Sequence, residues 1–134
     1  MIGITMNSSN YETLVSSYPF DETVKRLQTA FKSKNMTIFA VIDHQAAAKA
    51  MELEMQPATV IVFGNPKAGT PLMIQEPKLA LKLPLKVLIT ETGGVVQVVF
   101  ETVESLIADT VIRYDMVEKT LGVAGKLIEK SIQS

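Results

Sequence analysis

Residues 83–101 read LPLKVLITETGGVVQVVFE, and this stretch decides the fold. Two runs rich in β-branched and other apolar residues, 83–92 and 95–101, flank Gly93-Gly94. A two-residue glycine connection is typical of a tight hairpin, because both turn positions need a positive φ. The sequence therefore predicts two antiparallel strands, near 84–92 and 95–101.

Upstream of this hairpin, helical and extended patterns alternate. Phe20, Val24, Leu27 and Phe31 recur at helical spacing, with acidic residues in the first turn and lysines in the last, so we expect an amphipathic helix over 20–34. Strands are expected at 36–43 and 59–64, with a helix over 44–54 between them that Asp43 caps. Two short β-prone runs, 1–6 and 11–17, are separated by turn-forming residues and suggest an N-terminal hairpin.

The segment 63–73, FGNPKAGTPLM, contains two helix-start signals. Asn65-Pro66 and Thr70-Pro71 each place a good N-cap residue before a proline. Because Pro71 would interrupt a helix begun at Pro66, we expect one turn over 66–69 and a separate short helix over 71–75. Gly64 and Gly69 are expected to supply backbone freedom at the two joints.

The C-terminal part is predicted to be helical. One helix is expected over 103–112 and a second over 115–133, where Asp115 and Glu118 have capping-box spacing. The second helix has a predicted apolar stripe formed by Val117, Leu121, Ala124, Ile128 and Ile132. The whole pattern predicts a single α+β domain over 1–134, with helices packed on one mixed sheet that includes the hairpin.

The helix at 44–54 is central to the expected topology. A connection of about 15 residues is long enough to join parallel strands, so we expect 36–43 and 59–64 to run parallel. Their carboxyl ends would then share one edge, which would bring His44 close to the loop that begins at Asn65.

Composition excludes several classes of function. Lysine and arginine number 13 against 14 acidic residues, so the net charge of -1 gives no electrostatic footprint for nucleic acid. The chain has no cysteine, which excludes thiol catalysis, disulfides and thiolate metal sites. No signal-peptide pattern or long apolar run is present, and we therefore predict a cytoplasmic location without membrane contact.

The run from Val41 to Gly94 resembles the domain-of-unknown-function 302 family. The similarity covers residues 11–100 and rests on VIDHQAAAKA, FGNPKAGTPLM and the LPLK strand opening. It implies a compact, homodimeric α/β domain without an established reaction. Relatives are expected to carry a histidine-containing segment near Arg113-Tyr114-Asp115, which this chain lacks, since His44 is its only histidine. This difference argues against a two-histidine metal centre, and we predict neither a metal nor a cofactor.

Candidate chemistry centres on His44 and the segment around Lys67. An imidazole titrates near neutrality, at about pH 6.5, and a helix N-terminus favours its neutral form. Backbone N–H groups at two helix starts, together with Lys67, could hold a carboxylate or phosphate. The Walker A spacing is absent, and both features also have ordinary structural explanations as a helix-start residue and as tight turns. The predicted ligand-binding residues are Asp43, His44, Gly64, Asn65, Pro66, Lys67 and Thr70.

These observations lead to one main functional prediction and two alternatives. The main one is a homodimeric binding or interaction module, because strand 36–43 is apolar on both faces and one small chain has few elements to cover both. A small anionic molecule is the predicted ligand at the His44 and Asn65–Lys67 edge. The first alternative is a small enzyme that uses His44 as general acid or base, with Lys67 binding an anionic substrate. The second is a purely structural dimer without a ligand.

Overall fold

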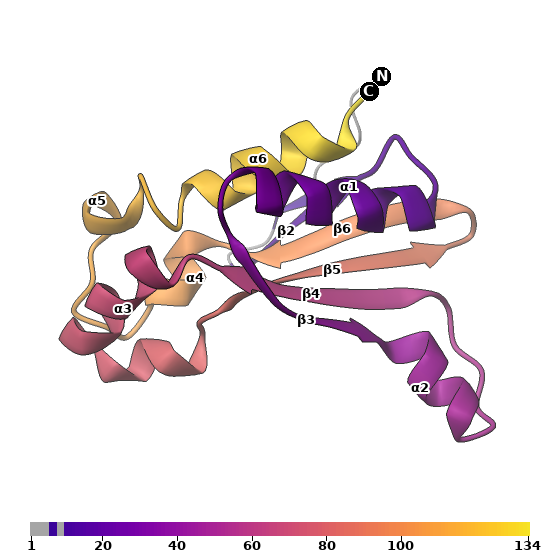
Figure 1. Ribbon diagram of the computed structural model, residues 1–134, viewed down its shortest axis with the longest axis horizontal. Coiled ribbons are helices and arrows are strands. Elements are labelled where there is room, and N and C mark those ends of the chain that lie inside the picture. The colour runs from indigo at the N-terminus through magenta and orange to yellow at the C-terminus, as the bar shows by residue number, and fades with distance from the viewer. Residues whose placement is uncertain (1–5, 8–9) are drawn as a thin grey trace.

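A computed structural model describes residues 6–7 and 10–134 of the chain (Figure 1). The strands are β1 (Met6–Asn7), β2 (Tyr11–Val15), β3 (Thr37–Asp43), β4 (Ala58–Gly64), β5 (Leu85–Thr92) and β6 (Val95–Glu101). The helices are α1 (Phe20–Ser33), α2 (His44–Ala50), α3 (Pro66–Gln75), the 3-10 helix η1 (Pro77–Leu81), α4 (Val103–Ile107), α5 (Tyr114–Val117) and α6 (Val123–Ile132). The α+β class predicted from the sequence is confirmed.

The strands form one sheet in the order β1-β2-β6-β5-β4-β3. The predicted β5–β6 hairpin is confirmed, with Thr92 opposite Val95 and positive φ angles of 60° at Gly93 and 79° at Gly94. In the expected N-terminal hairpin, Met6–Asn7 pairs antiparallel with β2, while residues 1–5 and 8–9 lie outside the described part of the chain.

Helices α1 and α6 cover one face of the sheet. The predicted apolar face of α1 is confirmed: Leu27 and Phe31 are fully buried, and Phe20 and Val24 pack against the same cluster. The Phe31 ring stacks on Phe63 of β4, with ring centroids 3.8 Å apart. The main core also takes in these buried residues of the sheet and α6: Leu14, Ile61, Val87, Ile89, Val96, Val98, Phe100, Ala124, Ile128 and Ile132.

A second, smaller core lies at the end of the sheet where β4 ends. There α3, η1, α4 and α5 gather, while α2 projects from the opposite end (Figure 1). The buried members of this second core are Leu72, Leu79, Leu106, Ile112, Val117 and Leu121. The predicted C-terminal stripe is buried in full, but its members are divided between the two cores.

The expected parallel pair is wrong. β3 and β4 are antiparallel, with Thr37 opposite Gly64 and Asp43 opposite Thr59, and every strand pairing among the described residues is antiparallel. A parallel crossover needs a helix that packs across the sheet. α2 ends at Ala50 and has no buried residue, so the chain simply turns back into β4.

The predicted break at Thr70-Pro71 is also wrong. α3 runs without interruption from Pro66 to Gln75, with Pro71 inside it. The missing N–H of Pro71 removes one helical hydrogen bond, the one that would go to the carbonyl of Lys67. Lys67 is exposed, so water can replace that partner.

The C-terminal helices are shorter than predicted. α4 ends at Ile107, and Asp109 then adopts a positive φ of 61°. The expected helix over 115–133 is two helices, and the N-cap of α5 is Arg113 rather than Asp115. At the joint, a Cβ on Gly122 would lie 2.5 Å from the carbonyl oxygen of Glu118, which explains why glycine stands there.

Candidate functional site

His44 lies at the start of an exposed arm, which we define as residues 44–57, the connection from β3 to β4. Asp43 caps α2 as predicted: its Oδ1 accepts a hydrogen bond of 2.9 Å from the N–H of Ala46. His44 is the first residue of the helix and is exposed. A second contact holds the arm together, since Gln45 Nε2 donates to the carbonyl of Met55 at 3.0 Å.

The segment around Asn65 lies at the other end of β4. Asn65 caps α3, with its Oδ1 accepting from the N–H of Lys67 at 3.0 Å, and Pro66 occupies the first helical position. Lys67 is exposed, and Thr70 lies inside the helix rather than at a helix start. Gly64 has no positive φ, and a Cβ there would meet Pro84 at an ordinary 3.6 Å, so this position does not require glycine.

The antiparallel pairing separates the two halves of the predicted site. Asp43 lies opposite the start of β4, whereas Asn65 follows its end. At about 3.3 Å per residue, the length of β4 puts His44 and Asn65 about 20 Å apart. The expectation that His44 meets the loop within one chain is therefore wrong, while the binding roles of the individual residues remain predictions.

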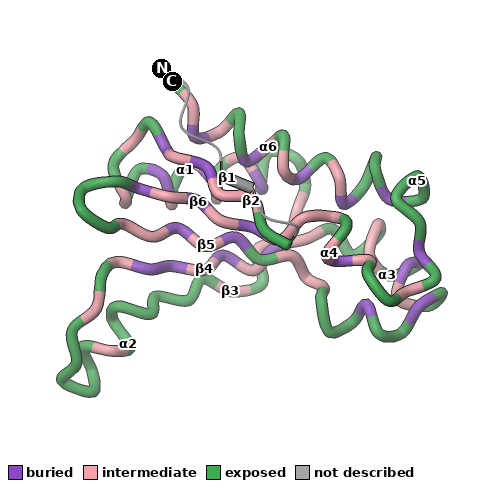
Figure 2. Tube along the Cα trace, turned by 180° about the vertical axis from the view of Figure 1, so that it is seen from behind, coloured by how far each residue is buried: buried purple, intermediate pink, exposed green. Residues whose placement is uncertain are grey.

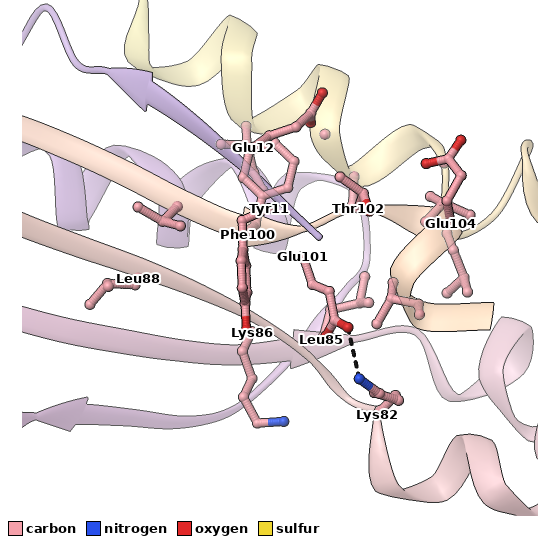
Figure 3. Close-up of a pocket in the computed structure, with 18 of the residues that line it drawn as sticks. Tyr11, Glu12, Lys82, Leu85, Lys86, Leu88, Phe100, Glu101, Thr102 and Glu104 are labelled. Carbon is pink, nitrogen blue, oxygen red and sulfur yellow. Dashed lines mark hydrogen bonds and ion pairs between the residues drawn. The ribbon is translucent and has the colours of Figure 1, made fainter. Parts of the chain in front are cut away.

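A cleft of about 750 Å³ opens where β2 begins and β6 ends (Figure 3). Its polar centre is Glu101, which receives a hydrogen bond of 2.8 Å from Lys82 Nζ and one of 2.5 Å from Ser105 Oγ. These three residues connect the end of η1, β6 and α4. Sequence reasoning missed this cluster; the spacing of four between Glu101 and Ser105 was the only local signal, because Lys82 is brought in by the β5–β6 hairpin.

The two partners in this ion pair stabilise each other's charge. Burial alone would raise the pKa of Glu101, but the hydrogen bonds from Lys82 and Ser105 and the nearby positive charges outweigh it, so the pKa is lowered. The hydrogen bond to Glu101 in turn raises the pKa of Lys82. Both groups are held in their charged forms at neutral pH. The cluster therefore links the end of η1 to β6 and α4, and it is not arranged to transfer a proton.

Glu12 lies close to Glu101 in the sheet but in a different environment. Burial, followed by repulsion from Glu129 and Glu104, raises its pKa. Glu12 is opposite Phe100 while Tyr11 is opposite Glu101, so the two carboxylates point to opposite faces of the sheet. Although both residues line the cleft, this arrangement does not bring the two carboxylates together as a pair. Among the described residues, no group of three or more His, Asp or Glu side chains could hold a metal ion.

One row of side chains on the face of the sheet away from α1 and α6 is apolar, while the rows on either side of it also contain polar and charged residues. Ile42, Val60, Leu88 and Val99 follow one another in register across four strands. Their strand neighbours Ile61, Val87 and Ile89 belong to the main core, so alternation directs this row to the other side, which we call the open face. Beside it, β3 and α2 are largely exposed, in contrast with the buried residues that recur along β4–β6 (Figure 2).

Apolar side chains also stand exposed along β3 and at the tip of the arm. Phe39 is 51% exposed and Ile42 42%, and beyond α2 the exposure reaches 73% at Met51 and 65% at Leu53. None of the helices within 6–7 and 10–134 combines the length and the apolar character needed to cross a bilayer. Exposed apolar side chains thus lie on the edge strand β3 and on the arm, and others, such as Ile74 and Leu81, lie at the opposite end of the molecule.

Comparisons with known proteins place these features in a family. The family model "Domain of unknown function DUF302" matches residues 12–133. A solved structure of an uncharacterized conserved DUF302 protein from Bacillus stearothermophilus superposes with a TM-score of 0.71 over 91% of this chain and 94% of that one. The identity is 14%, so this likeness concerns the fold.

Curated relatives match by sequence over a shorter segment. Proteins named fluoride-specific ion channel FluC 1, from Brucella suis biovar 1 (strain 1330) and Brucella abortus biovar 1 (strain 9-941), are 38% identical over 86 residues. The match covers 64% of this chain but only 34% and 32% of those proteins, so this chain corresponds to about a third of their length. With the family model matching nearly the whole of the described chain, this protein belongs to the DUF302 family.

Proposed function

We propose that this domain is a homodimeric interaction module. The observation that carries the proposal is the apolar surface on β3, on the arm and on the open face. An antiparallel sheet with one solvated face normally alternates apolar and polar residues. Here one outward row is apolar across four strands and ends at the exposed Ile42, and exposed apolar patches commonly mark interaction sites.

Within one chain, the geometry does not assemble the site of the expected small enzyme. An enzyme of the expected kind needs His44 and Lys67 at one substrate, and the antiparallel topology holds them about 20 Å apart in one chain. The charged residues that do meet, Lys82 and Glu101, are paired with each other. A purely structural dimer differs from our proposal only in having no ligand.

The relatives suggest a context for such a module. In the Brucella proteins named fluoride-specific ion channels, the matching segment is about a third of the chain. We propose that the domain acts as an association unit, either alone or joined to another domain, and that it works in the cytoplasm. Its contribution in a larger protein would be to bring two copies together.

Light scattering over a protein concentration series tests the proposal. One chain has a mass of 14.7 kDa, and we expect twice that value at micromolar concentration. Ile42→Glu should shift the mass toward that of one chain, because it puts a charge into the apolar surface. Val95→Glu is the matched control: Val95 is also exposed, at 45%, but lies at the hairpin turn. A single-chain mass for the wild type at every concentration would overturn the proposal.

The predicted anionic ligand has a separate test. Thermal shift with inorganic phosphate would compare the wild type with His44→Ala and Lys67→Ala. Smaller stabilisation of either variant would support binding by that residue, and equal stabilisation of all three proteins would remove the predicted site.

A further inference from the structure

β3 is an edge strand with little of the usual protection against pairing. It ends the sheet order, so one side of its backbone has no neighbouring strand among the described residues. Natural edge strands are commonly very short, carry lysine or proline, or contain a β-bulge. β3 has seven residues, TIFAVID, with no proline and one charge, at its last position. A bulge between Ile38 and Ala40 is its one irregularity. Such an edge is a ready template for another strand.

The two ends of β3 carry opposite charges. Lys32 and Lys34 precede it, at the end of α1. Asp43 ends the strand, and in the arm Glu52 and Glu54 outnumber Lys49. Antiparallel pairing of two β3 strands would place the basic start of each beside the acidic end of the other, whereas parallel pairing would place like charges together.

The same antiparallel arrangement would also bring together apolar surfaces from the two ends of the molecule. Met51 and Leu53 are exposed on the arm, beyond the end of β3. At the opposite end, Ile74 of α3 and Leu81 of η1 are 77% and 84% exposed. Figure 1 shows α2 beyond one end of the sheet and α3 beyond the other. A half-turn about the middle of β3 brings each arm toward the α3 and η1 end of the other copy.

We infer that two copies of this chain pair antiparallel through β3, about a two-fold axis near Ala40, with each arm docked on the α3 and η1 end of the other copy. This inference rests on the proposed homodimer and specifies its interface. It joins two six-stranded sheets into one continuous sheet. It also sets the partner subunit's His44 opposite Met36, one strand away from Asn65, so the two halves of the predicted site come together between chains.

Cysteine cross-linking tests the strand pairing, and the chain has no native cysteine to interfere. In an antiparallel pair, opposite Cα atoms lie about 4.5–5.5 Å apart, which is within disulfide range. Under mild oxidation, Ala40→Cys should therefore form a covalent dimer rapidly and nearly completely. Val95→Cys, at the exposed hairpin, should remain largely a single chain.

The outcomes separate this inference from the homodimer itself. Light scattering of both variants under reducing conditions reports whether the dimer is present. A dimer in which Ala40→Cys cross-links no faster than Val95→Cys would overturn the β3 pairing while leaving the homodimer standing. A single-chain mass would overturn both.

A double-mutant cycle tests the docking of the arm. Leu53→Ser and Ile74→Ser should each raise the dimer dissociation constant several-fold, while circular dichroism of the subunit stays unchanged because both side chains are exposed. If the two side chains meet across the interface, the double variant should weaken the dimer less than the product of the single effects. Unchanged dissociation constants for both single variants would overturn the docking of the arm.

Discussion

The helix-covered face of the sheet and its open side both carry large apolar residues, but these residues have opposite surroundings. On the covered face, Phe63 is buried and stacked on Phe31, at the centre of the main core. On the open side, Phe39 of the neighbouring strand is about half exposed. The difference teaches that apolar content alone does not define a core. A core also needs a covering layer, and α1 and α6 supply one on a single face.

The largest expected effect comes from removing a ring on each side. Phe63→Ala should lower the free energy of unfolding by about 3–5 kcal/mol, because it leaves a cavity against Phe31. Phe39→Ala should cost the single chain less than about 1 kcal/mol, because the ring is a surface position there. Urea unfolding at a protein concentration below the dimer dissociation constant measures both. Equal losses of stability would show that the Phe63 ring is no better packed than the Phe39 ring.

A glycine substitution next to α6 tests the packing of the helices that cover the sheet. Gly122 precedes α6, and an added methyl group would come within 2.5 Å of the Glu118 carbonyl oxygen. Gly122→Ala should therefore destabilise the protein by about 1–3 kcal/mol, a typical cost of overpacking. Gly64→Ala is the control, since its Cβ would meet only ordinary contacts, and we expect a change within about 0.5 kcal/mol. Thermal unfolding of the two variants compares their stabilities. If Gly64→Ala lost as much stability as Gly122→Ala, the crowding at Gly122 would not explain the effect.

Two carboxylates on opposite faces should respond to pH with opposite signs. The pKa of Glu101 is lowered in the folded state, so its stabilising effect is full at neutral pH and is lost as the pH falls through that lowered value. The pKa of Glu12 is raised, so its ionised form carries a cost at neutral pH that disappears below the unfolded value of about 4.3.

The corresponding glutamine variants measure this difference. Glu101→Gln should be less stable than the wild type at pH 7, with the difference shrinking below about pH 4. Glu12→Gln should be more stable than the wild type at pH 7 and similar to it in acid. We expect effects of about 1 kcal/mol or less, since both groups are partly hydrated. Urea unfolding from pH 3 to 7 measures these effects. If both variants changed the stability at pH 7 in the same direction, the opposite pKa shifts of Glu101 and Glu12 would be contradicted.

The smallest effect on global stability is expected in the arm. Asp43→Ala removes the cap of α2, which is worth about 0.5–2 kcal/mol to that helix. Since α2 buries no residue, the loss should appear as faster hydrogen exchange of the α2 amides with little change in global unfolding. His44→Ala at the next position is the control and should leave exchange nearly unchanged. Global destabilisation by Asp43→Ala would mean that the arm is coupled to the main core.

Local sequence signals identified most elements and caps of this protein. Gly93-Gly94 specified the hairpin, the spacing of Leu27 and Phe31 specified the buried face of α1, and Asp43 and Asn65 cap helices as predicted. These features depend on a few neighbouring residues, so one sequence contains the necessary information. The apolar character of both faces of β3 also indicated that one chain would leave a side uncovered.

Only the tertiary structure decided how these elements meet. A connection of about 15 residues can join strands in either direction, and α2 packs too little against the sheet to form a crossover, so β3 and β4 are antiparallel. That single choice separated His44 from Asn65 and left the arm exposed, while the strand order placed β3 at the edge. The Lys82–Glu101–Ser105 cluster was likewise invisible in the sequence, because the register of the hairpin and the positions of η1 and α4 bring its members together. The sequence by itself determined the elements and their apolar faces; the packing of α1 and α6 on the same face of the sheet determined which surfaces remained open.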